Sequence, residues 1–275
     1  MGAFMSASKY SWLRENLSEM LHEQFVFREL LMQLTYRDLI LRYKQSVMGF
    51  GWAICAPLLN MLIFSVIFMR VAPLHTSVPY PIYAYAGLLP WTMFANSIRF
   101  SAISLTLNVD LVSKVYFPRE ILPFSAILVS LVDFAVASSI LVALMFYYGI
   151  RVTPAIVFLP VILLVQLAFT AGLSLLVAMG NLFYRDFKYI TELGLTVWML
   201  ATSVVYPVEL IQGRLGIILR LNPMTPIIDA YRAVLLRGEL PTAAPFTGAA
   251  LFSVVLFVFG WLVFHVEEFQ FAENI

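Results

Sequence analysis

Residues 152–184 read VTPAIVFLPVILLVQLAFTAGLSLLVAMGNLFY and contain no charged side chain. About 20 apolar residues, at roughly 1.5 Å each in a helix, cross the ~30 Å hydrocarbon layer of a bilayer. Five more stretches are long enough, and only two of them contain an acid; they are residues 45–69, 76–98, 121–150, 189–208 and 240–264. The pattern predicts an all-α polytopic membrane protein with six transmembrane helices per chain.

The composition supports this fold class. Hydrophobic residues make up 61% of the chain and charged residues 12%, whereas a typical soluble domain has about 25% charged residues. The formal net charge of +1 excludes the strongly basic surface of a nucleic-acid-binding protein. The single cysteine, Cys55, excludes an intrachain disulfide.

We expect three parts: an N-terminal segment (1–24), an amphipathic helix in the membrane interface (25–44) and a six-span transmembrane domain (45–275). The spans are predicted at about 47–70, 82–105, 120–148, 155–181, 189–208 and 244–265, with a short helix at 107–117 and an outer re-entrant segment at 209–238. Lys and Arg are more frequent on the side that holds both termini, so the positive-inside rule predicts cytoplasmic termini. The first apolar run begins too late for a signal peptide.

Two short segments have helical patterns outside the spans. In 25–44, apolar residues recur at helical spacing, and they are Phe27, Leu30, Leu31, Leu34 and Leu41. This pattern predicts an interfacial helix, and a generic basic anchor is the alternative. In 107–120, Asn108 or Asp110 can cap a short helix that serves as a docking element for a soluble partner, and a well-capped loop is the alternative.

Asp133 lies well inside the third predicted span. Intramembrane acids are costly and usually face a partner or the interior of the bundle. Arg99 could pair with Asp133 or extend toward the inner interface. We favour a structural pairing over a proton relay, and on that interpretation Asp133→Asn leaves function nearly intact.

Aromatic side chains make up 15% of the chain. They fit an aromatic belt and core packing, or a path along which sugar rings slide. The candidates for lining such a path are Phe50, Trp52, Tyr83, Trp91, Phe94, Trp198 and Tyr206.

The segment 206–239 is too polar for a span and too apolar for a free loop. Its prolines and glycines predict short helices that dip into the outer leaflet, where they could gate a path. The gate candidates are Pro207, Glu209, Asn222, Pro223, Asp229 and Arg232.

Motifs for catalysis and cofactor binding are absent from the sequence. There is no GxxxxGK[ST] loop for ATP and no HExxH or Cys/His cluster for a metal. The three histidines, His22, His75 and His265, lie in unrelated segments. We therefore expect a non-enzymatic chain with no catalytic residues, no metal and no cofactor of its own.

Several motifs together resemble the membrane subunit of bacterial ABC-type polysaccharide exporters. They are RDLILRYKQSVMGFGW (37–52), FPREILP (117–123), YRDFKYI (184–190) and NPMTPIIDAYRAVLL (222–236), and the likeness extends to the FAENI end (271–275). That family exports O-antigen, capsule and teichoic-acid polymers across the bacterial inner membrane.

The resemblance implies a homodimer with a channel at its interface. Two copies of a separate ATPase would carry ATP and Mg²⁺, and the substrate would be a polymer on a polyprenyl diphosphate. Residues expected to contact the ATPase are Arg37, Asp38, Arg42, Tyr43, Phe117, Pro118, Arg119, Glu120, Arg185 and Asp186. Arg119→Glu is then expected to uncouple ATP hydrolysis from transport.

Other functions remain open from the sequence. O-antigen is the first choice of cargo, and capsular polysaccharide, teichoic acid or a smaller lipid or drug are the alternatives. A membrane-embedded glycosyltransferase or acyltransferase would need clustered acids or histidines at one membrane face. An ion-coupled transporter would need more intramembrane ionisable groups than Asp133.

Overall fold

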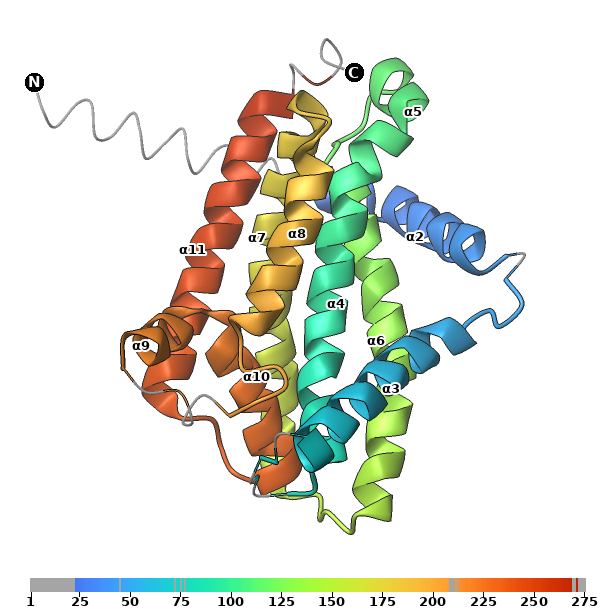
Figure 1. The fold of residues 1–275 in the computed structure, drawn as a ribbon. Helices are drawn as coiled ribbons and strands as arrows, with labels where there is room; N and C mark the ends of the chain where they lie inside the picture. The colour runs from blue at the N-terminus through green and yellow to red at the C-terminus, as the bar shows by residue number, and fades with distance from the viewer. Residues whose placement is uncertain are drawn as a thin grey trace, which may run out of the picture.

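The computed structural model describes residues 23–44, 46–71, 73–74, 76, 78–207, 211, 213–268 and 271, without the side chains of residues 215 and 218. Every regular element in this part of the chain is a helix (Figure 1). The elements are α2 (Arg28–Tyr43), α3 (Gly51–Val66), η1 (Ile67–Val71), α4 (Tyr80–Leu107), α5 (Val109–Lys114), α6 (Ile121–Tyr147), η2 (Pro154–Phe158), α7 (Leu159–Phe183), α8 (Phe187–Leu200), α9 (Gly213–Leu221), α10 (Met224–Arg232), η4 (Ala233–Arg237) and α11 (Ala243–Glu267). The prediction of an all-α protein is confirmed for the described residues.

Within the described residues, four helical stretches combine the length and the apolar composition that crossing a membrane requires. They are Gly51–Val71, Ile121–Tyr147, Pro154–Phe183 and Ala243–Glu267. The two other predicted spans correspond to α4 and α8, which differ from these four for separate reasons.

Helix α4 is long, with 28 residues, but it contains more polar side chains because it is the central helix of the bundle (Figure 1). It packs against α3, α6, α7, α8 and α10. Ser97 and Ser101 are fully buried on it, and their hydroxyls donate to backbone carbonyls of Met93 and Pro123. A helix that is surrounded by protein can hold such groups, because they find partners without facing lipid.

Helix α8 contains 14 residues and is therefore about 21 Å long, shorter than the predicted span at 189–208. A turn follows Leu200, and its residues Ser203 and Val204 have carbonyl groups outside any helix. Inside a bilayer such groups need other partners. Arg232 supplies them, because its guanidinium donates to the carbonyl oxygens of Ser203 and Val204, each at 2.6 Å. The helix ends early because a residue distant in sequence satisfies the turn.

The two ends of the bundle are different. Figure 1 shows α2 and α5 at one end and α9, α10 and the start of α11 toward the other. We call these the α5 end and the α10 end. The polar junctions described below lie at both.

Candidate functional site

Helix α2 lies across the α5 end and packs on α6 (Figure 1). Leu34 is buried, and Phe27, Leu30 and Leu31 pack around it against the same apolar cluster. The predicted apolar face of this segment is therefore present, except that Leu41 is 65% exposed. Helix α2 therefore packs against the rest of the chain through one apolar face, and most of its other residues are more exposed.

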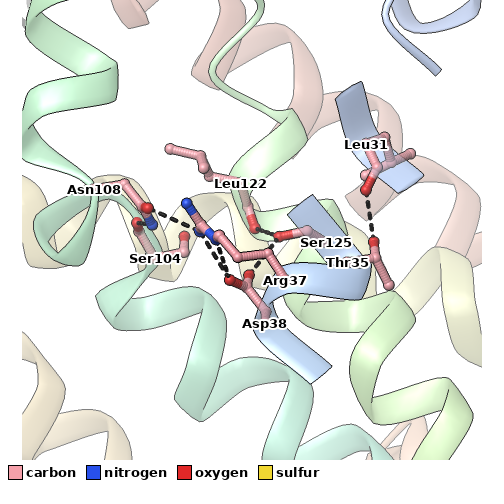
Figure 2. Close-up of polar contacts among 8 residues, drawn as sticks. All are labelled: Leu31, Thr35, Arg37, Asp38, Ser104, Asn108, Leu122 and Ser125. Carbon is pink, nitrogen blue, oxygen red and sulfur yellow. Dashed lines mark hydrogen bonds and ion pairs between the residues drawn. The ribbon is translucent and has the colours of Figure 1, made fainter. Parts of the chain in front are cut away.

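Arg37 and Asp38 join α2 to two other helices. Arg37 lies 2.8 Å from Asp38 and donates to the side-chain oxygen of Asn108 at 2.9 Å, as Figure 2 shows. The hydroxyl of Ser125 on α6 donates to the other carboxylate oxygen of Asp38 at 3.3 Å. Asn108 is the residue between α4 and α5, so a displacement of α5 reaches α2 through one hydrogen bond.

The side chain of Asn108 does not cap α5. Its amide nitrogen donates to the carbonyl of Ser104 at 2.8 Å, and so it closes the end of α4. Asp110 forms an exposed ion pair with Lys114 at 2.6 Å, and this pairing lowers the pKa of Asp110. The prediction that Asn108 or Asp110 caps the short helix by its side chain was wrong, because both side chains have other partners.

Asp133 pairs with α2, which corrects the predicted pairing with Arg99. Arg42 and the hydroxyl of Tyr43 each donate to one carboxylate oxygen of Asp133, at 2.5 Å. Arg99 forms an exposed pair with Glu192 instead, at 2.7 Å. Burial and the Asp133 carboxylate raise the pKa of Tyr43 to about 12, so its hydroxyl remains a donor at neutral pH. The structural interpretation of Asp133 is retained with a different partner.

A second junction connects the α5–α6 turn to the end of α11. Arg119 donates to the Val112 carbonyl on α5 at 3.4 Å and to Glu268 at 3.2 Å. Glu120, which is 1% exposed, lies 3.1 Å from the His265 ring nitrogen on α11. These contacts tie three elements together beneath the exposed surface of α5.

Glu120, His265 and Glu268 place their ligand atoms within 4.8 Å of one another, close enough to hold a metal ion. The guanidinium of Arg119 already contacts Glu268 and supplies positive charge at this place. A cation would compete with that charge. We therefore interpret these four residues as a buried ion-pair cluster, which we call the α11 cluster.

The predicted ATPase-contact residues separate into buried and exposed groups. Phe117, Pro118 and Glu120 are buried within the chain, so their contact with an ATPase stays a prediction. Arg185 and Asp186 are exposed. Tyr116, which is 80% exposed beside α5, is a further candidate, and its only mark in the sequence is an aromatic ring at the end of a polar turn.

A cavity of about 430 Å³ adjoins this exposed surface. It lies between the α4–α5 junction and the α7–α8 turn, and Arg185, Lys188, Val109 and Asn181 are among its lining residues. Basic and apolar side chains thus border one concave surface next to α5.

The aromatic candidates also separate by burial. Phe50 and Trp52 on the approach to α3 are about half exposed, at 48% and 52%. Tyr83, Trp91 and Phe94 are buried, at 7%, 3% and 0%. These three side chains belong to the core of the chain, and their place in a channel wall stays a prediction. Trp198 and Tyr206 are partly exposed and stay candidates.

Asn222 and Arg232 fix the outer segment at the α10 end. Asn222 accepts from the Trp198 indole at 3.0 Å and donates to the Ala201 carbonyl at 2.8 Å. Arg232 is fully buried, and its guanidinium lies over the ring of Tyr83 at 3.8 Å. Both side chains hold the segment rather than face an open path.

Three other gate candidates lie in or next to this segment. Asp229 on α10 lies 3.6 Å from Arg232. Pro207 precedes the segment, Pro223 lies between α9 and α10, and both are partly exposed. Glu209 lies outside the described residues.

The family model described as "ABC-2 type transporter" matches residues 29–236, well over half of the chain. The chain belongs to this family. The match begins in the first turn of α2 and ends in η4, so this ABC-2 transporter has both α2 and the outer segment inside the family domain.

Curated relatives match nearly the whole chain. The O-antigen export system permease protein RfbA of Myxococcus xanthus is 34% identical, over 93% of this chain and 99% of its own length. The protein of the same name from Klebsiella pneumoniae is 31% identical, over 89% and 94%. The polysialic acid transport protein KpsM of Escherichia coli is 21% identical, over 86% and 92%.

Asp133→Asn in this ABC-2 transporter is expected to lower the free energy of unfolding by about 1–3 kcal/mol, because a charged hydrogen-bonding partner of Arg42 is lost. Export by the folded fraction is still expected to be nearly intact, because Arg42 and Tyr43 give Asp133 a structural role. A double-mutant cycle with Arg42→Gln, read by thermal unfolding in detergent, should give a coupling energy of about 0.5–3 kcal/mol. Simple additivity of the two changes would contradict the pairing.

The α11 cluster predicts that the stability of the folded chain depends on pH. Burial, with Glu120 close by, raises the pKa of Glu268 from 4.5 to about 8. The folded state then binds more protons than the unfolded state between these values, so the free energy of unfolding falls as pH rises through this range. Glu268→Gln, which imitates the protonated acid, should flatten the dependence of melting temperature on pH from 6 to 8.5. Glu267→Gln is the matched control, and equal slopes in wild type and Glu268→Gln would contradict the assignment.

Proposed function

We propose that this ABC-2 transporter is the permease subunit of an ATP-driven exporter of lipid-linked polysaccharide, with O-antigen as the cargo. The observation that carries the proposal is the match to two O-antigen export permeases at 34% and 31% identity over nearly their full lengths. Such coverage supports a shared role for the whole chain rather than for one segment.

Six membrane crossings form part of the proposal. The four long apolar stretches supply four of them. Helix α4 supplies another, shielded from lipid by its neighbours, and α8 with the turn after it supplies the last. The segment from α9 to η4 then re-enters from the outer side, and the α5 end faces the cytoplasm.

The proposed assembly is a homodimer with two copies of a separate ATPase, which binds ATP and Mg²⁺. The ATPase docks on the exposed surface at Lys114–Tyr116 and on Arg185 and Asp186. Its movement passes from α5 to α2 through Asn108 and Arg37, and from α5 to α11 through Arg119. The two junctions would thereby tilt several spans together and open a channel at the homodimer interface.

The channel wall is proposed to include Phe50, Trp52, Trp198 and Tyr206. Their partly exposed rings can stack against sugar faces without one fixed hydrogen-bond geometry. Such tolerant contacts suit a polymer that slides through. The substrate is expected to be anchored by a polyprenyl diphosphate.

A second candidate is export of a capsular polysaccharide. The match to the polysialic acid transport protein favours it, although at 21% identity. Export of teichoic acid or a smaller lipid, and a membrane-embedded transferase, have no comparable observation behind them.

Gene deletion with complementation tests the proposal. Surface polysaccharide and intracellular lipid-linked glycan are measured together in the same cells. We expect loss of the surface polymer and accumulation of the glycan inside, restored only when the chain and the ATPase are both expressed. Normal surface polymer in the deletion strain would reject the polysaccharide cargo.

A further inference from the structure

At the α10 end, a cavity of about 270 Å³ opens between α9, α10, the end of η4 and the start of α11. Its volume is close to the lower end of the roughly 300–1,000 Å³ range of ligand pockets. Two arginines, Arg220 and Arg237, line it together with Thr225 and Asp229. Asp229 is the gate candidate that lines this cavity, whereas the residues assigned to the α5 end do not line it.

The charges in the cavity favour an anion. Asp229 is offset by the buried Arg232, whose guanidinium lies 3.6 Å from it. Arg237 has only a loose, exposed contact with Glu239, at 3.6 Å. In the part of the chain that the structure describes, no acid forms an ion pair with Arg220. Two guanidinium groups therefore face one concave space with little compensating negative charge.

Thr225 adds a hydrogen-bonding group that its own chain does not satisfy. The residue is 4% exposed, and among the described residues its hydroxyl has no hydrogen-bond partner. An unsatisfied buried hydroxyl is destabilising. The oxygen is enclosed by protein, so a ligand in the cavity reaches it only if the Thr225 side chain rotates.

The walls of the cavity are held in place before any ligand arrives. Gly238, directly after Arg237, has a positive φ of 72°, and a Cβ there would lie 2.5 Å from the Thr153 side chain. Thr153 also donates to the Gly238 carbonyl at 3.2 Å. Pro241 and Pro245 restrict the opposite wall. A preorganised site loses less conformational entropy when it binds.

We propose that this cavity is a binding site for a phosphate-type oxyanion, held by Arg220 and Arg237. The planar guanidinium matches the oxygens of a phosphate in a two-bond arrangement. The bound group is a diphosphate or phosphate, and its source is either a lipid head group or the free ion. The binding itself rests on the geometry alone; only its position on the outer side of the membrane rests on the proposed function.

The test measures binding of radiolabelled inorganic diphosphate to the full chain in phosphatidylcholine nanodiscs, without an ATPase. We expect saturable binding that weakens about tenfold or more in Arg220→Gln and in Arg237→Gln, since each variant loses a charge-assisted contact. Arg214→Gln, an exposed arginine on α9 that does not line the cavity, is the matched control and should bind as wild type.

Competition identifies the source of the oxyanion. Stronger competition by farnesyl diphosphate than by inorganic diphosphate would support an isoprenyl head group, and competition by phosphatidylglycerol in the nanodisc would support a membrane lipid. Equal competition by inorganic phosphate and farnesyl diphosphate would support the free ion. Absence of saturable binding, or equal affinity in wild type, Arg220→Gln and Arg237→Gln, would overturn the site. Because the assay needs neither ATP nor export, failure of the export proposal would leave this result unchanged.

Discussion

Arg232→Ala is expected to lower the free energy of unfolding by about 3–5 kcal/mol, because it leaves buried polar groups unpaired and removes a large buried side chain. The carbonyls of Ser203 and Val204 would lose their donors, each now at 2.6 Å. The segment after α8 would then no longer be fixed to α10. The measurement is thermal unfolding of the purified chain in detergent, with export read in complemented cells. Arg232→Lys should recover only part of the loss, because an ammonium group cannot contact both carbonyls in the same fork.

Glycine 87 gives an independent test of the same contact. A Cβ at Gly87 would lie 2.3 Å from the Val204 carbonyl oxygen and 2.4 Å from the guanidinium of Arg232. Gly87→Ala should therefore disturb the contact without removing any hydrogen-bonding group. Gly194→Ala on α8 is the control, since no atom lies within 4 Å of a Cβ there. Equal melting temperatures for the two alanine variants would show that the Arg232 contact does not position the segment.

Arg119→Glu is expected to abolish export because it breaks contacts within this chain, with Glu268 and with the Val112 carbonyl. The substitution places a new carboxylate beside Glu120, which is 1% exposed, and removes the guanidinium that donates to Glu268 at 3.2 Å. Like charges in a poorly solvated place repel strongly. We expect lower stability and, in the fraction that folds, ATP hydrolysis without polysaccharide export.

The charge-swapped pair Arg119→Glu with Glu268→Arg tests this cause. It restores opposite charges across the same contact and should recover most of the export and stability. Arg151→Glu, at an exposed loop position, is the control for charge reversal and should behave as wild type. A double variant no better than Arg119→Glu alone would mean that Arg119 acts on something other than Glu268.

The spacing of charges predicted the helical class of this protein, because a bilayer penalises charge in any segment that lipid surrounds. The same argument was least informative for α4 and α8. Helix α4 is shielded by neighbouring helices, and Arg232 binds the carbonyls of the turn that follows α8. Both outcomes depend on tertiary contacts that the local sequence does not contain.

The sequence motifs identified residues that form polar junctions in the structure, but they did not predict all the contacts of these residues. FPRE (117–120) was expected to face a partner, whereas Glu120 is buried against His265 and Arg119 contacts Glu268. The partner of Asp133 lies 91 residues away on α2, and no periodicity connects two such positions. Sequence patterns indicated which side chains matter, and the fold determined whether they point inward or outward.

ATP-dependent transfer of a lipid-linked polysaccharide across a membrane tests the central claim most directly. The chain and its ATPase would be reconstituted together in vesicles, and protection of the added glycan from an external glycosidase would be measured with and without ATP. Our account predicts protection only when both chains and ATP are present, with Arg119→Glu inactive. Protection without the ATPase, or chemical alteration of the glycan by this chain alone, would contradict it.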